Sequence, residues 1–61
     1  MIKIIVETKS QSKRVFEVED DELDSYAEEV LRAFKGGQPL HIEGVIFNTQ
    51  NVTLVEFQSE D

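Results

Sequence analysis

The N-terminal part of the chain alternates between apolar and polar side chains, the pattern expected of β-strands that are buried on one face. Residues 2–8, IKIIVET, show this alternation, and residues 14–19, RVFEVE, repeat it. The intervening residues 9–13, KSQSK, are polar and favour a turn. Two strands joined by so short a link predict an antiparallel β-hairpin.

A helical pattern follows the hairpin. Between residues 21 and 35, apolar side chains recur at intervals of three and four positions, which predicts an amphipathic helix. Its apolar stripe consists of Leu23, Tyr26, Ala27, Val30, Leu31 and Phe34. Asp20 or Asp21 is suited to accept hydrogen bonds from the first free amides. Gly36 is suited to a left-handed stop of the helix.

Two further strand-like runs complete the chain, namely residues 39–47, PLHIEGVIF, and residues 52–57, VTLVEF. The tetrad between them, residues 48–51, is typical of a turn. Gly44 predicts a bulge or a tight turn, so residues 39–47 form either one bent strand or two short ones. The order predicts an α+β fold, a small antiparallel ββαββ sheet or its five-stranded variant, with the helix on one face. Residues 1–61 are interpreted as a single domain.

Strict alternation distributes the apolar strand residues over both faces of this sheet. The helix-covered face is expected to hold Ile2, Ile4, Val6, Phe16, Val18, Leu40, Ile42, Ile46, Val52 and Leu54. The second face is expected to hold Ile5, Val15, Val45, Phe47, Val55 and Phe57. A second face this apolar predicts the interface of a homo-oligomer, a dimer or higher, with the two phenylalanines as anchors. The alternatives are scattered surface residues or a sheet that curls around them.

Size and composition favour such self-association. A chain of 61 residues buries only about 60% of the surface that its unfolded form exposes. The chain has no cysteine, so disulfides cannot add stability, and a structural metal site without thiolates is not expected. Oligomerisation, or docking on a partner, remains as a source of additional stability.

Thirteen acidic and six basic residues give a net charge of −7. Such a charge repels phosphate backbones, so we expect no direct nucleic-acid binding, and it favours a protein partner with a basic surface. The acidic face predicted to bind this partner consists of Glu19, Asp20, Asp21, Glu22, Asp24, Glu28 and Glu29. Regularly spaced carboxylates can imitate a nucleic-acid backbone. The alternative is a solvated helix face that only keeps the chain soluble.

Residues suited to catalysis are scarce. His41 is the only histidine, it lies in an expected strand, and no cysteine accompanies it, so we expect no enzyme and no cofactor. Asp20, Glu22 and Asp24 have the alternate spacing that opens a calcium loop. Ser25 and Leu31 stand where that loop needs glycine and glutamate, so no metal site is expected either.

No apolar stretch of the sequence approaches the ~20 residues that span a bilayer. Residues 1–9, MIKIIVETK, lack the basic start, long apolar run and cleavage site of a secretory signal. We therefore expect a cytoplasmic protein with no membrane partner.

The amide-rich turn at residues 48–51 supports a second hypothesis, because asparagine and glutamine offer the paired donors and acceptors that recognise a nucleobase edge. An oligomer would repeat this turn around a symmetry axis and build a pocket for a small molecule such as a nucleotide signal. The predicted ligand residues are Arg14, His41, Asn48, Gln50 and Asn51.

In overall character, being very short, acidic and free of cysteine, the chain resembles the accessory proteins carried by bacteriophages and bacterial mobile elements. The resemblance rests on this character and on no motif, and it implies a class of role. The leading hypothesis is a non-enzymatic, anti-defence type of protein that inhibits or modulates a host protein through its acidic face. The alternatives are an oligomer that sequesters a nucleotide signal and a structural or assembly subunit.

Overall fold

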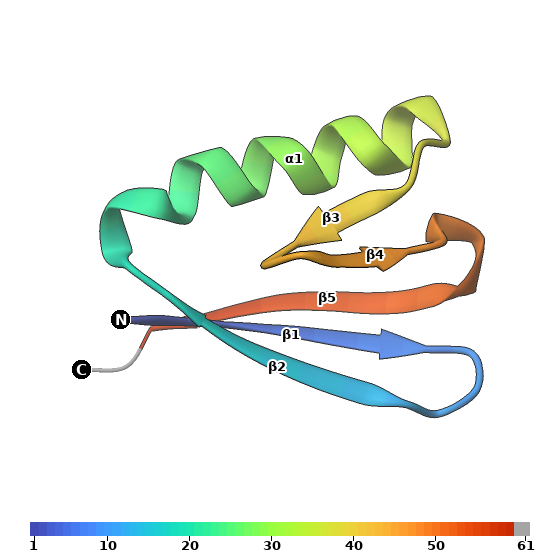
Figure 1. The fold of residues 1–61 in the computed structure, drawn as a ribbon, viewed down its shortest axis with the longest axis horizontal. Coiled ribbons are helices and arrows are strands. Elements are labelled where there is room, and N and C mark those ends of the chain that lie inside the picture. The colour runs from blue at the N-terminus through green and yellow to red at the C-terminus, as the bar shows by residue number, and fades with distance from the viewer. Residues whose placement is uncertain (60–61) are drawn as a thin grey trace.

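The computed structural model describes residues 1–59 and confirms the α+β fold, with five strands (Figure 1). In chain order the elements are β1 (Ile2–Thr8), β2 (Lys13–Val18), the 3-10 turn η1 (Asp20–Glu22), α1 (Leu23–Gly36), β3 (Leu40–Ile42), β4 (Val45–Phe47), the 3-10 turn η2 (Thr49–Asn51) and β5 (Val52–Ser59).

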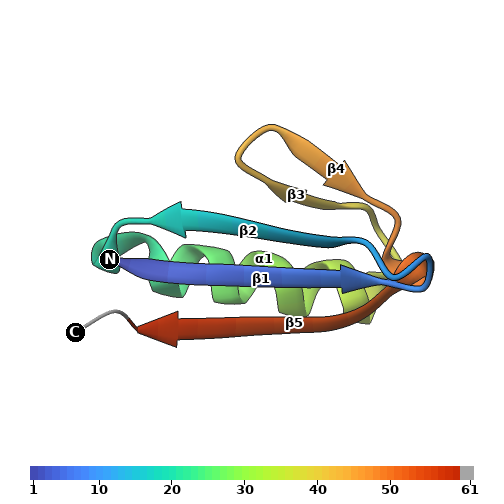
Figure 2. The same ribbon diagram turned by 90° about the horizontal axis from the view of Figure 1, so that it is seen from below.

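The strands form two sheets rather than one. A three-stranded antiparallel sheet has the order β2-β1-β5, and β3 pairs with β4 in a separate hairpin. The helix α1 covers one face of the larger sheet, as predicted (Figure 1). Figure 2 shows that the β3–β4 hairpin lies on the β2 side of the molecule, whereas β5 forms the opposite side.

The β1–β2 hairpin forms as the sequence predicts. Its turn is closed by a backbone hydrogen bond from the Thr8 amide to the Ser12 carbonyl at 3.0 Å. Gln11 has a φ of 66°, and its amide donates to the Thr8 carbonyl at 2.9 Å. The hydroxyls of Thr8 and Ser10 lie 2.9 Å apart, so the polar side chains of the turn bond to one another.

The helix begins and ends slightly later than the sequence predicts. The Glu19 amide donates to the Glu22 carboxylate at 3.1 Å, which ties down the start of η1. At the other end Gly37, not Gly36, takes the left-handed conformation, with a φ of 67°. The amides of Gly37 and Gln38 both donate to the Ala33 carbonyl, which satisfies an acceptor that the end of the helix leaves open.

The core lies between α1 and the inner face of the sheet and is closed on the β2 side by the β3–β4 hairpin. Its buried members are Ile2, Ile4, Val6, Phe16, Val18, Ala33, Leu40, Ile42, Phe47 and Val52. Leu23, Tyr26, Val30, Val45, Val55 and Phe57 are half-buried against them. Phe16 of β2 and Phe47 of β4 meet edge to face, with ring centroids 6.0 Å apart, and this contact joins the hairpin to the sheet.

The expected division of apolar residues between the two faces is wrong in β4 because of the turn before it. Glu43 and Gly44 have φ values of 49° and 79°, the left-handed pair of a two-residue hairpin turn. Ile42 therefore faces Val45 directly, and both point to the core. This turn places Phe47 inside and leaves Ile46 65% exposed, the reverse of strict alternation. Residues 39–47 thus contain two short strands.

The same division is wrong in β5 because of a bulge. Glu7 pairs with Leu54 but Thr8 pairs with Val52, so Thr53 is an extra residue in β5. Its hydroxyl donates to the Glu7 carbonyl at 3.3 Å. Beyond the bulge the alternation is inverted: Val55 and Phe57 pack against the core, and Leu54 points outward with 43% exposure.

The outer face of the larger sheet is consequently more polar than the sequence suggests. Of the six residues assigned to it as an oligomer interface, only Ile5 and Val15 lie there, as a directly opposed pair. Charged side chains surround them, because the register pairs Lys3 with Glu17 and Glu7 with Lys13 on either side. An interface built on Phe47 and Phe57 across this face is therefore not available.

Candidate functional site

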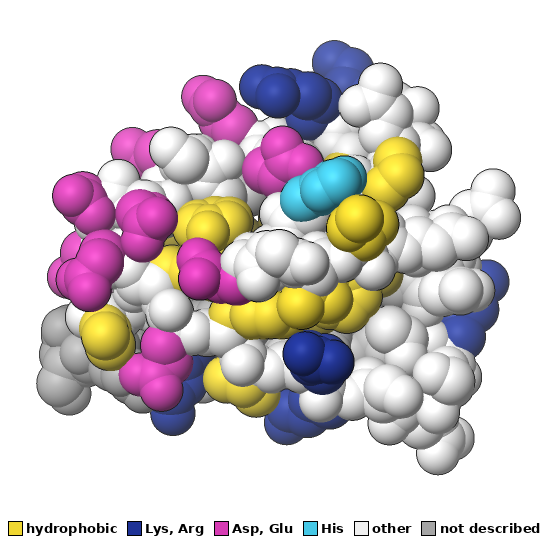
Figure 3. Space-filling model, in the orientation of Figure 1, with side chains coloured by type: hydrophobic (Ala, Val, Ile, Leu, Met, Phe, Trp, Pro, Cys, Tyr) yellow, Lys and Arg dark blue, Asp and Glu magenta, His cyan; other side chains and the backbone are white. Residues whose placement is uncertain are grey.

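The acidic residues that were singled out gather at one end of the molecule, around η1 and the start of α1. Figure 3 shows Asp and Glu side chains concentrated at the left of the molecule, the end at which α1 begins in Figure 1. Glu19, Asp20, Asp21, Asp24 and Glu28 are exposed, whereas Glu22 and Glu29 are half-buried. We call this group of seven residues the acidic end.

Three members of the acidic end take part in structural contacts, and Glu19 does so through its backbone amide. The Met1 amino group forms an ion pair with the Asp20 carboxylate at 2.8 Å, and Glu22 accepts the Glu19 amide. Within residues 1–59, the carboxylates of Asp21, Asp24 and Glu28 form no hydrogen bond or salt bridge. The partial positive charge at the start of α1 favours acids there, which helps the fold to tolerate so dense a group.

The basic residues lie mostly elsewhere. Lys9 and Lys13 flank the β1–β2 turn, at the end of the sheet where β5 begins, and Arg32 and Lys35 lie in the second half of α1. Arg14 lies over the ring of Phe16, 5.9 Å from its centroid, and does not reach the acidic end. The described chain is therefore polarised along its length, with carboxylates concentrated at one end.

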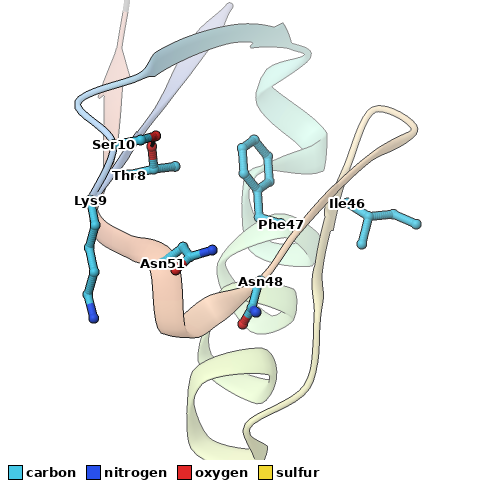
Figure 4. A pocket seen from close by; sticks show the side chains of 7 residues that line it. All are labelled: Thr8, Lys9, Ser10, Ile46, Phe47, Asn48 and Asn51. Atoms are coloured by element: carbon cyan, nitrogen blue, oxygen red, sulfur yellow. Dashed lines mark hydrogen bonds between the residues drawn. The ribbon is translucent and has the colours of Figure 1, made fainter.

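A pocket of about 430 Å³ opens at the opposite end of the molecule. Three segments form it: the β1–β2 turn, the end of β4 and the turn η2 (Figure 4). It is lined by Thr8, Lys9, Ser10, Ile46, Phe47, Asn48 and Asn51. In Figure 4 the ring of Phe47 points toward β2, with Thr8 and Ser10 to one side of it, and the Lys9 side chain extends away from that ring.

Backbone hydrogen bonds hold the segments of this pocket together. The Lys9 amide donates to the Asn51 carbonyl at 2.7 Å, which fixes the β1–β2 turn against η2. The Asn48 Oδ1 accepts a hydrogen bond from the Gln50 amide at 3.0 Å, so the side-chain oxygen of Asn48 serves the turn itself. The side-chain amide of Asn51 forms no hydrogen bond within the described residues, so it can bind a ligand.

The structure brings together only part of the predicted ligand residues. Asn48 and Asn51 line the pocket, whereas Arg14, His41 and Gln50 do not. His41 is exposed and pairs with Ile46 on the outward face of the β3–β4 hairpin. The lining residues Thr8, Lys9 and Ser10 were missed, because their approach to η2 depends on tertiary contacts between segments about 40 positions apart.

A further side-chain interaction was not expected from the sequence. Tyr26 of α1 donates a hydrogen bond to the Glu43 carboxylate at 2.6 Å, which links the helix to the tip of the β3–β4 hairpin. This bond, together with partial burial and the nearby charges of Glu43 and Glu22, raises the pKa of Tyr26 to about 12. The pair stabilises the position of the hairpin and is not a candidate for acid–base chemistry near neutral pH.

Two classes of site find no support in the described part of the chain. Residues 1–59 contain no group of three or more His, Asp or Glu side chains arranged to hold a metal ion. They also contain no helix that is long and apolar enough to cross a membrane.

No known family model matches the chain, and comparisons with curated proteins and with solved structures give no match. The functional argument therefore rests on the geometry of the acidic end and of the pocket.

Proposed function

We propose that the chain is a non-enzymatic binding protein that docks its acidic end on a basic surface of a macromolecular partner and thereby inhibits or modulates it. The observation that supports this function most strongly is the gathering of exposed carboxylates at one end of the fold. Within residues 1–59, the lysine and arginine side chains of α1 and of the β1–β2 turn form no ion pair with these carboxylates.

The arrangement suits recognition for two physical reasons. Dense charge of one sign steers a partner of opposite charge during encounter and penalises partners of like charge. The carboxylates also project from η1 and α1, which are ordered elements, so less conformational entropy is lost on binding than with a mobile acidic tail. Blocking a surface needs no catalytic group, which fits a sequence with a single histidine and no cysteine.

Charge reversal within the acidic end tests the proposal. Asp21→Lys/Glu28→Lys changes two exposed carboxylates that form no bond within residues 1–59. The matched control, Glu17→Lys/Glu56→Lys, makes the same change in net charge on the outer face of the sheet. Both variants keep the contacts made by Asp20 and Glu22.

The measurement is quantitative affinity purification from a bacterial lysate with three immobilised baits, followed by titration of the captured protein at fixed salt. We expect a basic protein to bind the wild type and the control alike and the acidic-end variant at least about tenfold more weakly. Equal capture by all three baits, or no captured protein with a basic surface, would contradict the proposed function.

The pocket supports a second candidate function, the binding of a small polar ligand such as a nucleotide. Its volume of about 430 Å³ lies in the range of small-molecule sites, and it combines an aromatic ring with hydroxyl, amide and lysine groups. Asn51→Ala removes a free amide and leaves the backbone bond to Lys9 intact, and Gln50→Ala is the control outside the pocket.

Calorimetry with a panel of nucleotides is the test of this second function. A nucleotide that binds the wild type and the Gln50→Ala variant should bind the Asn51→Ala variant about tenfold more weakly, because a hydrogen bond to a charged or polar ligand group is lost. The absence of binding heat across the panel would remove this candidate.

A further inference from the structure

The two edge strands of the larger sheet differ in how well they are protected from pairing with another chain. Three of the six residues of β2 are charged, Lys13, Arg14 and Glu17, and the β3–β4 hairpin lies on its side of the molecule (Figure 2). β5 has eight residues, VTLVEFQS, of which only Glu56 is charged, and it contains neither proline nor glycine. Charged side chains and covering segments are what keep sheet edges from pairing. Among residues 1–59 the β5 edge carries a single charged side chain, and no segment covers it (Figure 2).

The helix is also uncovered on this side. Tyr26 bonds to the β3–β4 hairpin, and Ala33, buried at 2% exposure, lies on the same flank of α1. At about 100° per residue, Ala27, Leu31 and Phe34 fall on the other flank, which faces away from the β3–β4 hairpin toward the β5 side of the molecule (Figure 2). Leu31 is 70% exposed and Phe34 42%. Both layers of the fold therefore end in uncovered apolar side chains on the same side.

We propose that this side, formed by β5 and the Ala27–Leu31–Phe34 flank of α1, binds a second copy of the chain. The two copies are related by a twofold axis, and their β5 strands pair antiparallel, so that two three-stranded sheets become one sheet of six strands. The backbone N–H and C=O groups along the free edge of β5 then form hydrogen bonds with the other copy. The exposed side chains of Leu31 and Leu54 are removed from water.

Charge selects the register of this pairing. Residues that face each other across an antiparallel pair point to the same side of the sheet. Two registers satisfy this requirement and pair the largest number of β5 residues. In one the twofold axis passes beside Val55, and in the other it passes beside Glu56. An axis beside Glu56 puts two carboxylates directly opposite each other, which is destabilising. An axis beside Val55 puts Glu56 opposite Leu54 of the other copy and is the register of the proposed dimer.

The distribution of charge along α1 identifies the occupant as a second copy in antiparallel orientation. Asp24 lies in the first turn of α1 and Lys35 in the last, and both flank the stripe that contains Leu31. Antiparallel helices bring Asp24 of one copy beside Lys35 of the other, whereas a parallel arrangement brings like charges together.

The nearly uncharged β5 edge offers little to the basic partner of the acidic end. The dimer uses Asp24 and leaves the other six residues of each acidic end outside the interface, so this inference goes beyond the proposed function and does not depend on it.

Analytical ultracentrifugation over a concentration series tests the dimer. We expect the wild type to show twice the chain mass of 7.0 kDa. Leu31→Lys and Leu54→Lys should each weaken dimerisation at least about tenfold with an unchanged circular dichroism spectrum. Ile46→Lys is the matched control, because Ile46 is 65% exposed on the β3–β4 hairpin. A wild type that stays at 7.0 kDa throughout, or an Ile46→Lys variant that dissociates as readily as the other two, would overturn the proposal.

A disulfide trap tests the register independently. The chain has no cysteine, so a disulfide formed by a single-cysteine variant joins two copies. Val55→Cys should form a covalent dimer rapidly under mild oxidation, because the two substituted positions face each other across the axis. Val15→Cys, on the opposite edge strand, should not. Cross-linking of the Val15→Cys variant in preference to the Val55→Cys variant would place the contact at β2 and refute the proposed dimer.

Discussion

At the scale of single residues, Glu43 occupies a conformation that its side chain does not favour. Its φ of 49° lies in the left-handed region, where glycine and asparagine are the usual residues. The 2.6 Å hydrogen bond from Tyr26 supplies a reason for a carboxylate at this position. The bond fixes the hairpin tip against α1 and so offsets the backbone strain of the turn.

The titration of Tyr26 makes this contact measurable. Because the pKa is raised from 10.0 to about 12 in the folded chain, the folded state holds the tyrosine proton more tightly than the unfolded state. The bond therefore stabilises the fold fully below pH 10, and its contribution disappears as the pH rises from 10 toward 12. Urea unfolding should show the wild type about 0.5–1 kcal/mol more stable than Tyr26→Phe near neutral pH. The two stabilities should converge in strong alkali, and a difference that persists there would contradict this account.

At the scale of elements, two local irregularities decide which side chains enter the core. The left-handed turn at Glu43 and Gly44 reverses the alternation between β3 and β4. The bulge at Thr53 reverses it within β5. Without these two features the sheet would expose Phe47 and Phe57 and would bury Leu54 and Ile46 in their place.

Replacement of glycine by alanine at Gly44 and at Gly36 should change the stability of the fold in opposite directions, and this difference tests the role of the β3–β4 turn. Gly44→Ala should lower the free energy of unfolding by about 1–2 kcal/mol, because a Cβ disfavours the left-handed conformation even though the space around it is open. Gly36→Ala lies in the last turn of α1 with no positive φ, and its Cβ would meet only the flexible Gln38 side chain at 3.7 Å. It should raise stability by about 0.5–1 kcal/mol. Chemical denaturation of both variants measures these two changes in the free energy of unfolding. A loss of stability in both would contradict the explanation that the left-handed conformation of Gly44 causes the loss.

At the scale of the whole molecule, the distribution of charge matters more than its sum. The net charge is −7, but the repulsion is concentrated at the acidic end. Two carboxylates about 7 Å apart repel by roughly 0.6 kcal/mol in water at low salt, and Asp21 has Asp20, Glu22 and Asp24 as acidic neighbours along η1 and the first turn of α1. The favourable interaction of one acid with the helix dipole is about 0.3–1 kcal/mol. Repulsion therefore exceeds the dipole effect for Asp21.

This balance predicts how stability responds to salt. Screening should raise the free energy of unfolding of the wild type, measured in urea because urea is uncharged, by about 1 kcal/mol between low and moderate salt. Asp21→Asn should be more stable than the wild type at low salt and should respond less to added salt. If Asp21→Asn is instead less stable at low salt, then the helix dipole outweighs the repulsion and this reasoning fails.

The pattern of residues determined the elements of this protein, because hydrophobic periodicity and turn chemistry are local. The β1–β2 hairpin and the amphipathic helix were predicted from it, as was the acidic end, whose members are neighbours in the sequence. Strand structure at residues 39–47 was also predicted, but the choice between one bent strand and two short ones stayed open. Only two of the five predicted ligand residues, Asn48 and Asn51, line the pocket, since the remainder of that pocket is contributed by the distant β1–β2 turn.

Tertiary structure alone decided which face each apolar side chain takes and which edge of the sheet stays open. A period-two pattern carries no information on the absolute face after a turn or a bulge, because one added residue inverts every position that follows. Thr53 is such a residue, and its effect is visible only from the register of β5 on β1. The placement of the β3–β4 hairpin beside β2, which leaves β5 as the unprotected edge, likewise depends on the packing of Phe16 against Phe47 and on no local signal.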